Sequence, residues 1–108
     1  ETSSKEIGRK SKIVVKPFVI SDFTDIKDTL DALREGYTIA LVNIRPLKER
    51  DIVELKRAVN KLKKTCDAIE GDIAGFGEDW IVVTPSFAEV YRTTHTEEVK
   101  GEGARVND

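Results

Sequence analysis

The sequence predicts one mixed α/β domain, a two-layer sandwich in which two helices pack on a five-stranded mixed sheet. Two observations carry this prediction. Two apolar, β-branched runs, at 13–20 and 38–44, are each followed by a segment whose apolar residues have helical spacing. Three short strand-like segments then follow one another with only turns between them. The chain has 108 residues, which leaves room for a single domain.

The first half of the chain predicts a parallel strand–helix–strand unit. The run 13–20 has strand composition, and Pro17, which has no N–H to donate, favours an edge position or a local irregularity. The next segment carries one apolar helical face, made of Ile26, Leu30 and Leu33. Gly36 is expected to end that helix. The nearly continuous apolar run 38–44 is typical of a central strand that is covered on both faces.

The second half predicts a longer helix and an antiparallel meander. The helix is expected at about 48–64, after Pro46, with acidic residues early and lysines late, as the helix dipole favours. Its apolar stripe consists of Ile52, Leu55, Val59 and Leu62. We expect the three strands near 66–69, 72–75 and 80–84, which gives the element order β-α-β-α-β-β-β.

Polar segments are expected to flank this domain. Residues 1–12 bury almost nothing and are interpreted as a flexible lead-in, and residues 93–108 are interpreted as a loose polar tail. The globular domain is therefore assigned to 13–92.

Composition excludes several classes of protein. The chain has 18 basic and 20 acidic residues, a balance that argues against a nucleic-acid partner, which would require a basic excess. A single cysteine cannot form an internal disulfide, so the reducing interior of a cell is expected. No apolar run approaches the roughly 20 residues of a membrane span.

Reactive side chains are scarce, so we predict no enzymatic activity and neither a metal nor a cofactor. His95 lies in a polar stretch and Cys66 among apolar neighbours, which indicates a solvated side chain and a small buried one. The glycines of 71–77 lack the Lys-Ser/Thr ending of a phosphate-binding loop and lead into no helix. Turns and bulges explain them better.

Two aromatic residues are the best candidates for a contact surface. Phe76 and Trp80 stand on either side of a tight turn, and such rings are common anchors of protein interfaces. Core filling is the alternative, and it is equally compatible with Trp80. If either ring is exposed, it marks a contact site.

These segments also carry a family resemblance. The chain from Lys16 to Tyr91 resembles SepF, a division protein of Gram-positive bacteria, cyanobacteria and many archaea. The resemblance rests on 38–44 before a charged helix, on Ala-Ile-Glu-Gly-Asp-Ile at 68–73, and on Asp-Trp-Ile-Val-Val-Thr-Pro at 79–85. The family's second motif is close to Ala-Ile-Gly-Gly-Asp-Ile, so Glu70 replaces its first glycine.

The resemblance implies a cytoplasmic scaffold at the inner face of the membrane at the division site. Such a domain dimerises, can form higher polymers, and binds the C-terminal tail of FtsZ. An amphipathic helix on its N-terminal side anchors the assembly to the membrane. Ile7 is the only aliphatic residue of 1–12, so we expect that helix upstream of this sequence.

The resemblance also assigns residues. The tail-binding region corresponds to Ile69, Gly71, Asp72, Gly75, Phe76, Trp80 and Ile81. Candidates for the dimer contact are Leu55, Val59 and Leu62. Lys63-Lys64 stands where bacterial members commonly have Ser-Gly, which fits an archaeal-type member better. The alternative function is a regulatory module that binds a small ligand in a pocket near 71–77.

Overall fold

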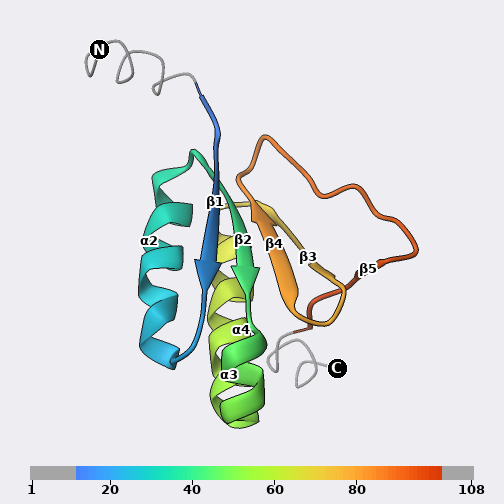
Figure 1. Ribbon diagram of the computed structural model, residues 1–108. Coiled ribbons are helices and arrows are strands. Elements are labelled where there is room, and N and C mark those ends of the chain that lie inside the picture. The colour runs from blue at the N-terminus through green and yellow to red at the C-terminus, as the bar shows by residue number, and fades with distance from the viewer. Residues whose placement is uncertain (1–11, 101–108) are drawn as a thin grey trace, which may run out of the picture.

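The structure, a computed structural model, describes residues 12–100. Figure 1 shows the order of the elements along the chain. The strands are β1 (Val14–Val19), β2 (Thr38–Asn43), β3 (Asp72–Phe76), β4 (Trp80–Thr84) and β5 (Thr96–Glu97). The helices are the 3-10 turn η1 (Phe23–Asp25), α2 (Ile26–Glu35), α3 (Arg45–Arg50) and α4 (Ile52–Ala68).

The five strands form one mixed sheet in the order β1-β2-β4-β3-β5. β1 and β2 are parallel, and the other neighbours are antiparallel. The predicted fold class is therefore confirmed. β1 is an edge strand that pairs only with β2, so the edge position inferred from Pro17 is confirmed as well.

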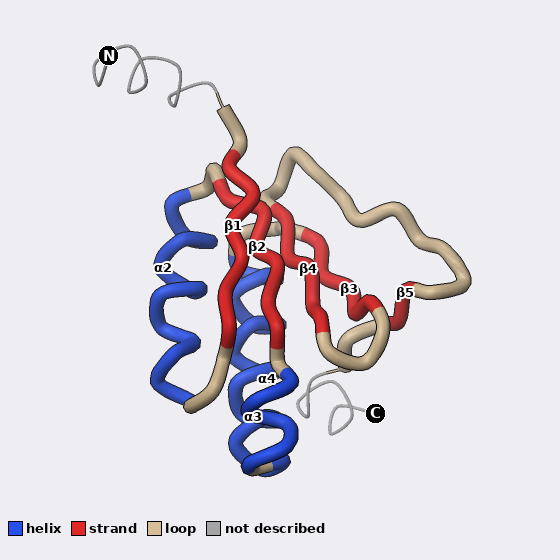
Figure 2. Tube along the Cα trace, in the orientation of Figure 1, coloured by secondary structure: helices blue, strands red, loops and turns tan. Residues whose placement is uncertain are grey.

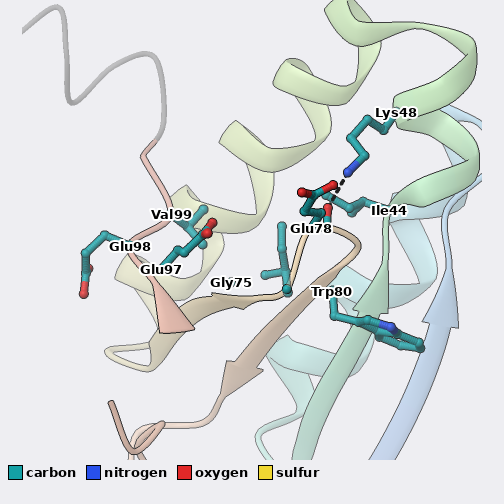
Figure 3. A pocket seen from close by; sticks show the side chains of 10 residues that line it. Ile44, Lys48, Gly75, Glu78, Trp80, Glu97, Glu98 and Val99 are labelled. Carbon is teal, nitrogen blue, oxygen red and sulfur yellow. Dashed lines mark hydrogen bonds between the residues drawn. The ribbon is translucent and has the colours of Figure 1, made fainter. Parts of the chain in front are cut away.

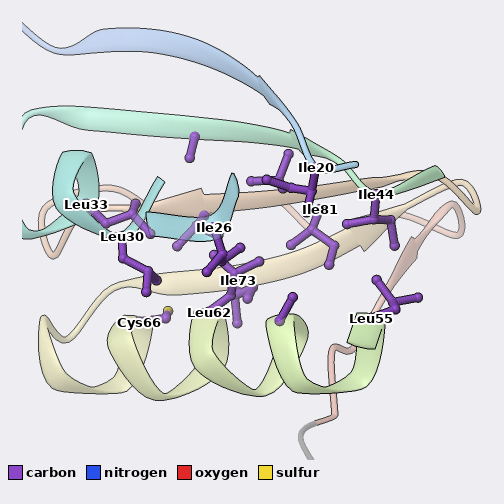
Figure 4. Packing of buried hydrophobic residues seen from close by; sticks show 14 of the residues in the cluster. Ile20, Ile26, Leu30, Leu33, Ile44, Leu55, Leu62, Cys66, Ile73 and Ile81 are labelled. Atoms are coloured by element: carbon purple, nitrogen blue, oxygen red, sulfur yellow. The ribbon is translucent and has the colours of Figure 1, made fainter. Parts of the chain in front are cut away.

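The helices α2 and α4 pack against each other and cover the same face of the sheet; in the views of Figures 1 and 2, α4 lies behind the strands and α2 lies beside β1 at the left. Alternate strand residues point to them, and Ala40 and Val42 of β2 and Val83 of β4 are fully buried there. Figure 4 shows Ile73 of β3 and Ile81 of β4 above the inner side of α4, where Leu62 is fully buried. The core thus occupies the single layer between helices and sheet.

The other face of the sheet carries no helix among the residues that the structure describes. Burial in β2 alternates accordingly: Thr38, Ala40 and Val42 are buried, whereas Ile39, Leu41 and Asn43 are half-buried. β2 is central, as expected, but the expectation that both of its faces are covered is wrong. Its apolar outer residues belong to a surface that the described chain leaves open.

The single helix expected at 48–64 is in fact two helices. Asp51 separates them with an extended backbone, and its carboxylate accepts hydrogen bonds from the backbone N–H groups of Val53 and Glu54 at 3.1 and 3.0 Å. This is a helix N-cap, which satisfies donors that the first turn leaves free. Pro46 lies in the first turn of α3, where its missing N–H costs nothing.

The strand expected at 66–69 is wrong, because α4 continues to Ala68. Thr65 and Cys66 are buried and prolong the apolar face of the helix by one turn beyond Leu62. The fifth strand is β5, which pairs with β3 and lies inside the segment expected to be a loose tail. The lead-in expected at 1–12 lies, apart from Lys12, outside the described residues.

Candidate functional site

The turn from α4 into β3 contains two of the predicted site residues, Ile69 and Gly71, on either side of Glu70. Glu70 has φ 59°, the left-handed conformation that ends many helices. A Cβ atom on Gly71 would lie 2.0 Å from the carbonyl oxygen of Thr84, so only glycine fits there. Gly71 therefore permits close approach of the chain to the end of β4. Ile69, just before the turn, is partly buried against the core.

Asp72 anchors the loop that joins β4 to β5. Its two carboxylate oxygens accept hydrogen bonds from Nη1 and Nη2 of Arg92, each at 3.0 Å, and one of them also accepts the backbone N–H of Val90 at 2.8 Å. These hydrogen bonds lower the pKa of Asp72 below its usual value of 3.8, and the hydrogen bond from Arg92 has the largest effect. Both carboxylate oxygens of Asp72 are therefore already hydrogen-bonded to groups of the same chain.

The remaining predicted contact residues divide between the two faces of the sheet, because alternate strand residues point in opposite directions. Gly75 and Ile81 form one cross-strand pair and are buried on the helix side. Phe76 and Trp80 form the next pair, and their exposed fractions are 53% and 37%. Neither aromatic ring therefore fills the core, and the condition for a contact surface is met.

Phe76 and Trp80 belong to a larger apolar surface, which we call the open face. The strand register continues it across the sheet, since Trp80 pairs with Asn43 and Val82 with Leu41. It is defined by Val15, Val19, Ile39, Leu41, Phe76, Trp80 and Val82. Ala74 faces the same side of the sheet but is only 1% exposed, so it is not part of the open face. Val15 and Val19 are 58% and 59% exposed. Apolar surface of this extent on a small domain is typical of a contact with another protein.

On the helix side, a hollow of about 320 Å³ lies at the end of the β3–β4 hairpin; we call it the hairpin hollow. Figure 3 shows its lining side chains, which come from β3, β4, α3 and the chain around β5. Its apolar part includes Ile44, Gly75, Ile81 and Val99, and Trp80 also borders it. Charged groups stand beside this apolar part: Lys48, Glu78, Glu97 and Glu98. The hollow therefore combines an apolar floor with a charged rim. Sites for peptides or small molecules usually combine apolar lining with polar groups that fix orientation.

Lys48 fixes the rim of the hairpin hollow. Its ammonium group donates to the backbone carbonyl of Glu78 and lies 3.1 Å from a carboxylate oxygen of Asp79. The N–H of Ile44 in turn donates to the carbonyl of Asp79 at 2.8 Å. These contacts join the β3–β4 turn to the start of α3 and hold this side of the hairpin hollow in place.

The residues expected to form the dimer contact are occupied within the chain itself. Leu55 and Leu62 are buried in the core, and Val59 is partly buried against it. The two leucines are therefore not available to a second copy, because the apolar stripe of α4 faces the sheet. Exposed apolar side chains that could contact a second copy lie instead on the open face.

The reactive side chains are placed as follows. Cys66 is buried, and burial raises the pKa of its thiol. His95 is exposed in the turn before β5. In the described part of the chain, no three potential metal-ligating His, Cys, Asp or Glu residues come together. No helix among residues 12–100 is long and apolar enough to cross a membrane.

Sequence reasoning missed several contributors to these sites, among them Lys48, Arg92 and Val99. Lys48 was one charge among many on a helix surface, and Arg92 and Val99 lie at the edge of or beyond the segment assigned to the globular domain. No local pattern marks them, because their partners are distant in sequence. Arg92, for example, contacts Asp72 across 20 positions.

Comparisons with known proteins agree with this architecture. Residues 15–90 match the family described as cell division protein SepF. A SepF-like protein from Archaeoglobus fulgidus has a similar structure, with TM-score 0.70, 23% identity, and coverage of 76% of this chain and 96% of the other. A SepF-like protein from Pyrococcus furiosus is also similar, with TM-score 0.63 and 30% identity; the match covers 73% of this chain and 94% of the other. A comparison with curated proteins found no match. The matched segment comprises most of the described chain, which therefore belongs to the SepF family of cell-division proteins.

Proposed function

We propose that this protein is a cell-division adaptor that forms a homodimer, binds the C-terminal tail of FtsZ and links it to the membrane from the cytoplasmic side. Membership of a cell-division family supports the general role. The observation that carries the specific proposal is the β3–β4 hairpin, which has an exposed apolar surface on one side and a lined hollow on the other.

The open face is the proposed dimer contact. It is apolar, is built on regular strands, and is free of helices among the described residues. Burying apolar surface is favourable by roughly 25 cal/mol per Å², and a second copy would cover this face with an equivalent face. Phe76 and Trp80 would be its aromatic anchors.

The hairpin hollow is the proposed site for the FtsZ tail. An apolar side chain of the peptide would enter between Ile44, Ile81 and Val99, and the charged rim would orient the peptide backbone. Each contact of this size is weak. A dimer that meets a polymer of many tails gains by avidity, so a weak single site is sufficient.

The test of the hollow is a titration of a fluorescent FtsZ C-terminal peptide into the whole chain. Val99→Asp places a charge in the apolar part of the hollow and should weaken binding about tenfold, since a buried unpaired charge is costly. Val53→Asp is the matched control on the exposed surface of α4 and should have no effect. No binding by a folded sample up to about millimolar peptide would refute the proposal. Thermal stabilisation by a metabolite in that case would favour a small-ligand module instead.

The test of the dimer contact is molar mass by light scattering. Phe76→Ser should shift the protein towards the monomer, because it removes an anchor of the open face. Phe87→Ser changes a ring of similar exposure, 61% against 53% for Phe76, that does not belong to the open face, and it serves as the control. Equal masses for both variants and the unaltered chain would contradict this assignment of the contact.

The link to the membrane is proposed from the family alone. It predicts that the full natural gene product co-sediments with lipid vesicles. The isolated 108-residue chain provides the comparison.

A further inference from the structure

The outer side of α4 carries an uninterrupted block of positive charge. Between Leu55 and Cys66 the helix has five basic residues and no acidic one, although the whole chain has a net charge of −2. The five are Lys56, Arg57, Lys61, Lys63 and Lys64. A charge distribution so uneven creates a local positive potential that the net charge conceals.

Part of this block surrounds a second, smaller hollow of about 190 Å³, which we call the α4 hollow. It is lined by Phe23, Arg57, Asn60, Lys61 and Lys64. The four α4 residues lie on adjacent turns of one helix face, and Phe23 comes from η1. No acidic side chain lines this hollow.

The cations of the α4 hollow differ in mobility. The guanidinium of Arg57 is stacked over the ring of Phe23, 4.1 Å from its centroid, and one of its nitrogens lies 2.7 Å from a carboxylate oxygen of Glu54. Its position is therefore fixed from two sides. Lys61 and Lys64 form no ion pair with any residue in 12–100, so their ammonium groups are free to turn towards a ligand.

We propose that the α4 hollow binds a carboxylate side chain of an acidic peptide, a site separate from the hairpin hollow. A planar, fixed guanidinium is well suited to a carboxylate, and the lysines add mobile donors. The volume is below the roughly 300 Å³ that is usual for a whole small ligand but is sufficient for one side chain of a longer partner. Lys56 and Lys63 extend the positive surface along the helix, so an extended acidic chain would meet further cations.

The position of α4 favours a peptide over a membrane surface. The helix lies on the face of the sheet opposite to the open face. If two copies pair through their open faces, their α4 helices point outward in opposite directions, and a flat membrane can reach only one of them. Flexible peptides reach both. This step rests on the proposed dimer, whereas the hollow and its charges do not.

The experiment measures fluorescence anisotropy of a labelled octaglutamate peptide with the whole chain at low ionic strength, about 0.05 M. The expected result is saturable binding that Lys61→Glu/Lys64→Glu weakens by about tenfold or more. Lys12→Glu/Lys100→Glu makes the same change in net charge at exposed lysines elsewhere and should alter binding by less than about twofold. All four positions are exposed, so every variant is expected to fold, which far-ultraviolet circular dichroism checks.

Two outcomes would overturn the proposal. Equal losses in both double variants would show attraction to net charge alone. Failure of octaglutamate to bind would exclude an acidic peptide as the occupant. If the chain then co-sediments with phosphatidylglycerol vesicles, the positive surface of α4 contacts a membrane instead. The FtsZ-peptide titration is a separate readout: Val99→Asp should affect only that peptide, and Lys61→Glu/Lys64→Glu should affect only octaglutamate. Failure of one site is thereby distinguished from failure of the other.

Discussion

Replacing Glu70 by glycine should stabilise this protein. Glu70 is the residue that terminates α4, and its φ of 59° lies in the left-handed region. A β-carbon in that region crowds the backbone, at a cost of roughly 1–2 kcal/mol that glycine does not incur. The related motif of the family has glycine at this point, so the substitution restores the residue that the turn favours.

The expected gain is smaller than that cost. Glycine also loses more backbone freedom on folding, roughly 0.5–1 kcal/mol. Glu70 carries a negative charge close to the negative end of the helix dipole, and its removal contributes a few tenths of a kcal/mol more. The net increase in the free energy of unfolding should be about 1 kcal/mol. For a domain of this size that raises Tm by about 4–8 °C.

Urea denaturation monitored by the fluorescence of Trp80 measures this change. Glu70→Ala is the matched control, because it removes the charge and keeps the β-carbon, so it should gain only the small electrostatic part. If Glu70→Gly is no more stable than Glu70→Ala, the left-handed residue does not cost stability and the reasoning is wrong.

Three further predictions concern the same end of the molecule and the core. Gly71→Ala should lower the urea midpoint strongly, because its Cβ would lie 2.0 Å from the carbonyl oxygen of Thr84, and an unchanged midpoint would contradict that geometry. Asp72 has a lowered pKa, so its contribution is present at neutral pH and is lost as pH falls below 3.8 through the folded-state value. Asp72→Asn should therefore destabilise at pH 7 and remove part of the acid dependence of unfolding, and hydrogen exchange at Val90 should become faster. Leu62→Ala, at a fully buried position, should cost about 2–5 kcal/mol in chemical denaturation, and a loss below about 1 kcal/mol would mean that the core relaxes to fill the cavity.

The sequence was sufficient for the class of fold because local patterns determine it. The β-branched runs, the helical apolar stripe of α2 and the edge preference of Pro17 depend on neighbouring residues. The end of α4 was misplaced for the opposite reason. Cys66 fits a strand or a helix equally well by composition, and tertiary packing against the sheet decides for the helix.

The candidate site could be predicted only in part. The sequence places Phe76 and Trp80 on either side of a short turn, but it leaves core filling open for Trp80, and only the structure shows that both rings are exposed. The division of the site into two faces follows from register, which depends on the pairing of β4 with both β2 and β3. The contacts of Lys48 and Arg92 join segments far apart in the chain, and no spacing rule encodes such contacts.

The margins of the sheet limit how this protein can associate. On one side, Pro17 interrupts the row of donors that another strand would need. On the other side, β5 is only two residues long. Proteins commonly protect sheet margins in these ways against uncontrolled strand addition. Neither edge strand therefore offers a second chain a long row of free backbone hydrogen-bonding groups. Many copies of the protein can accordingly be concentrated in one place without pairing edge to edge into a continuous β-sheet.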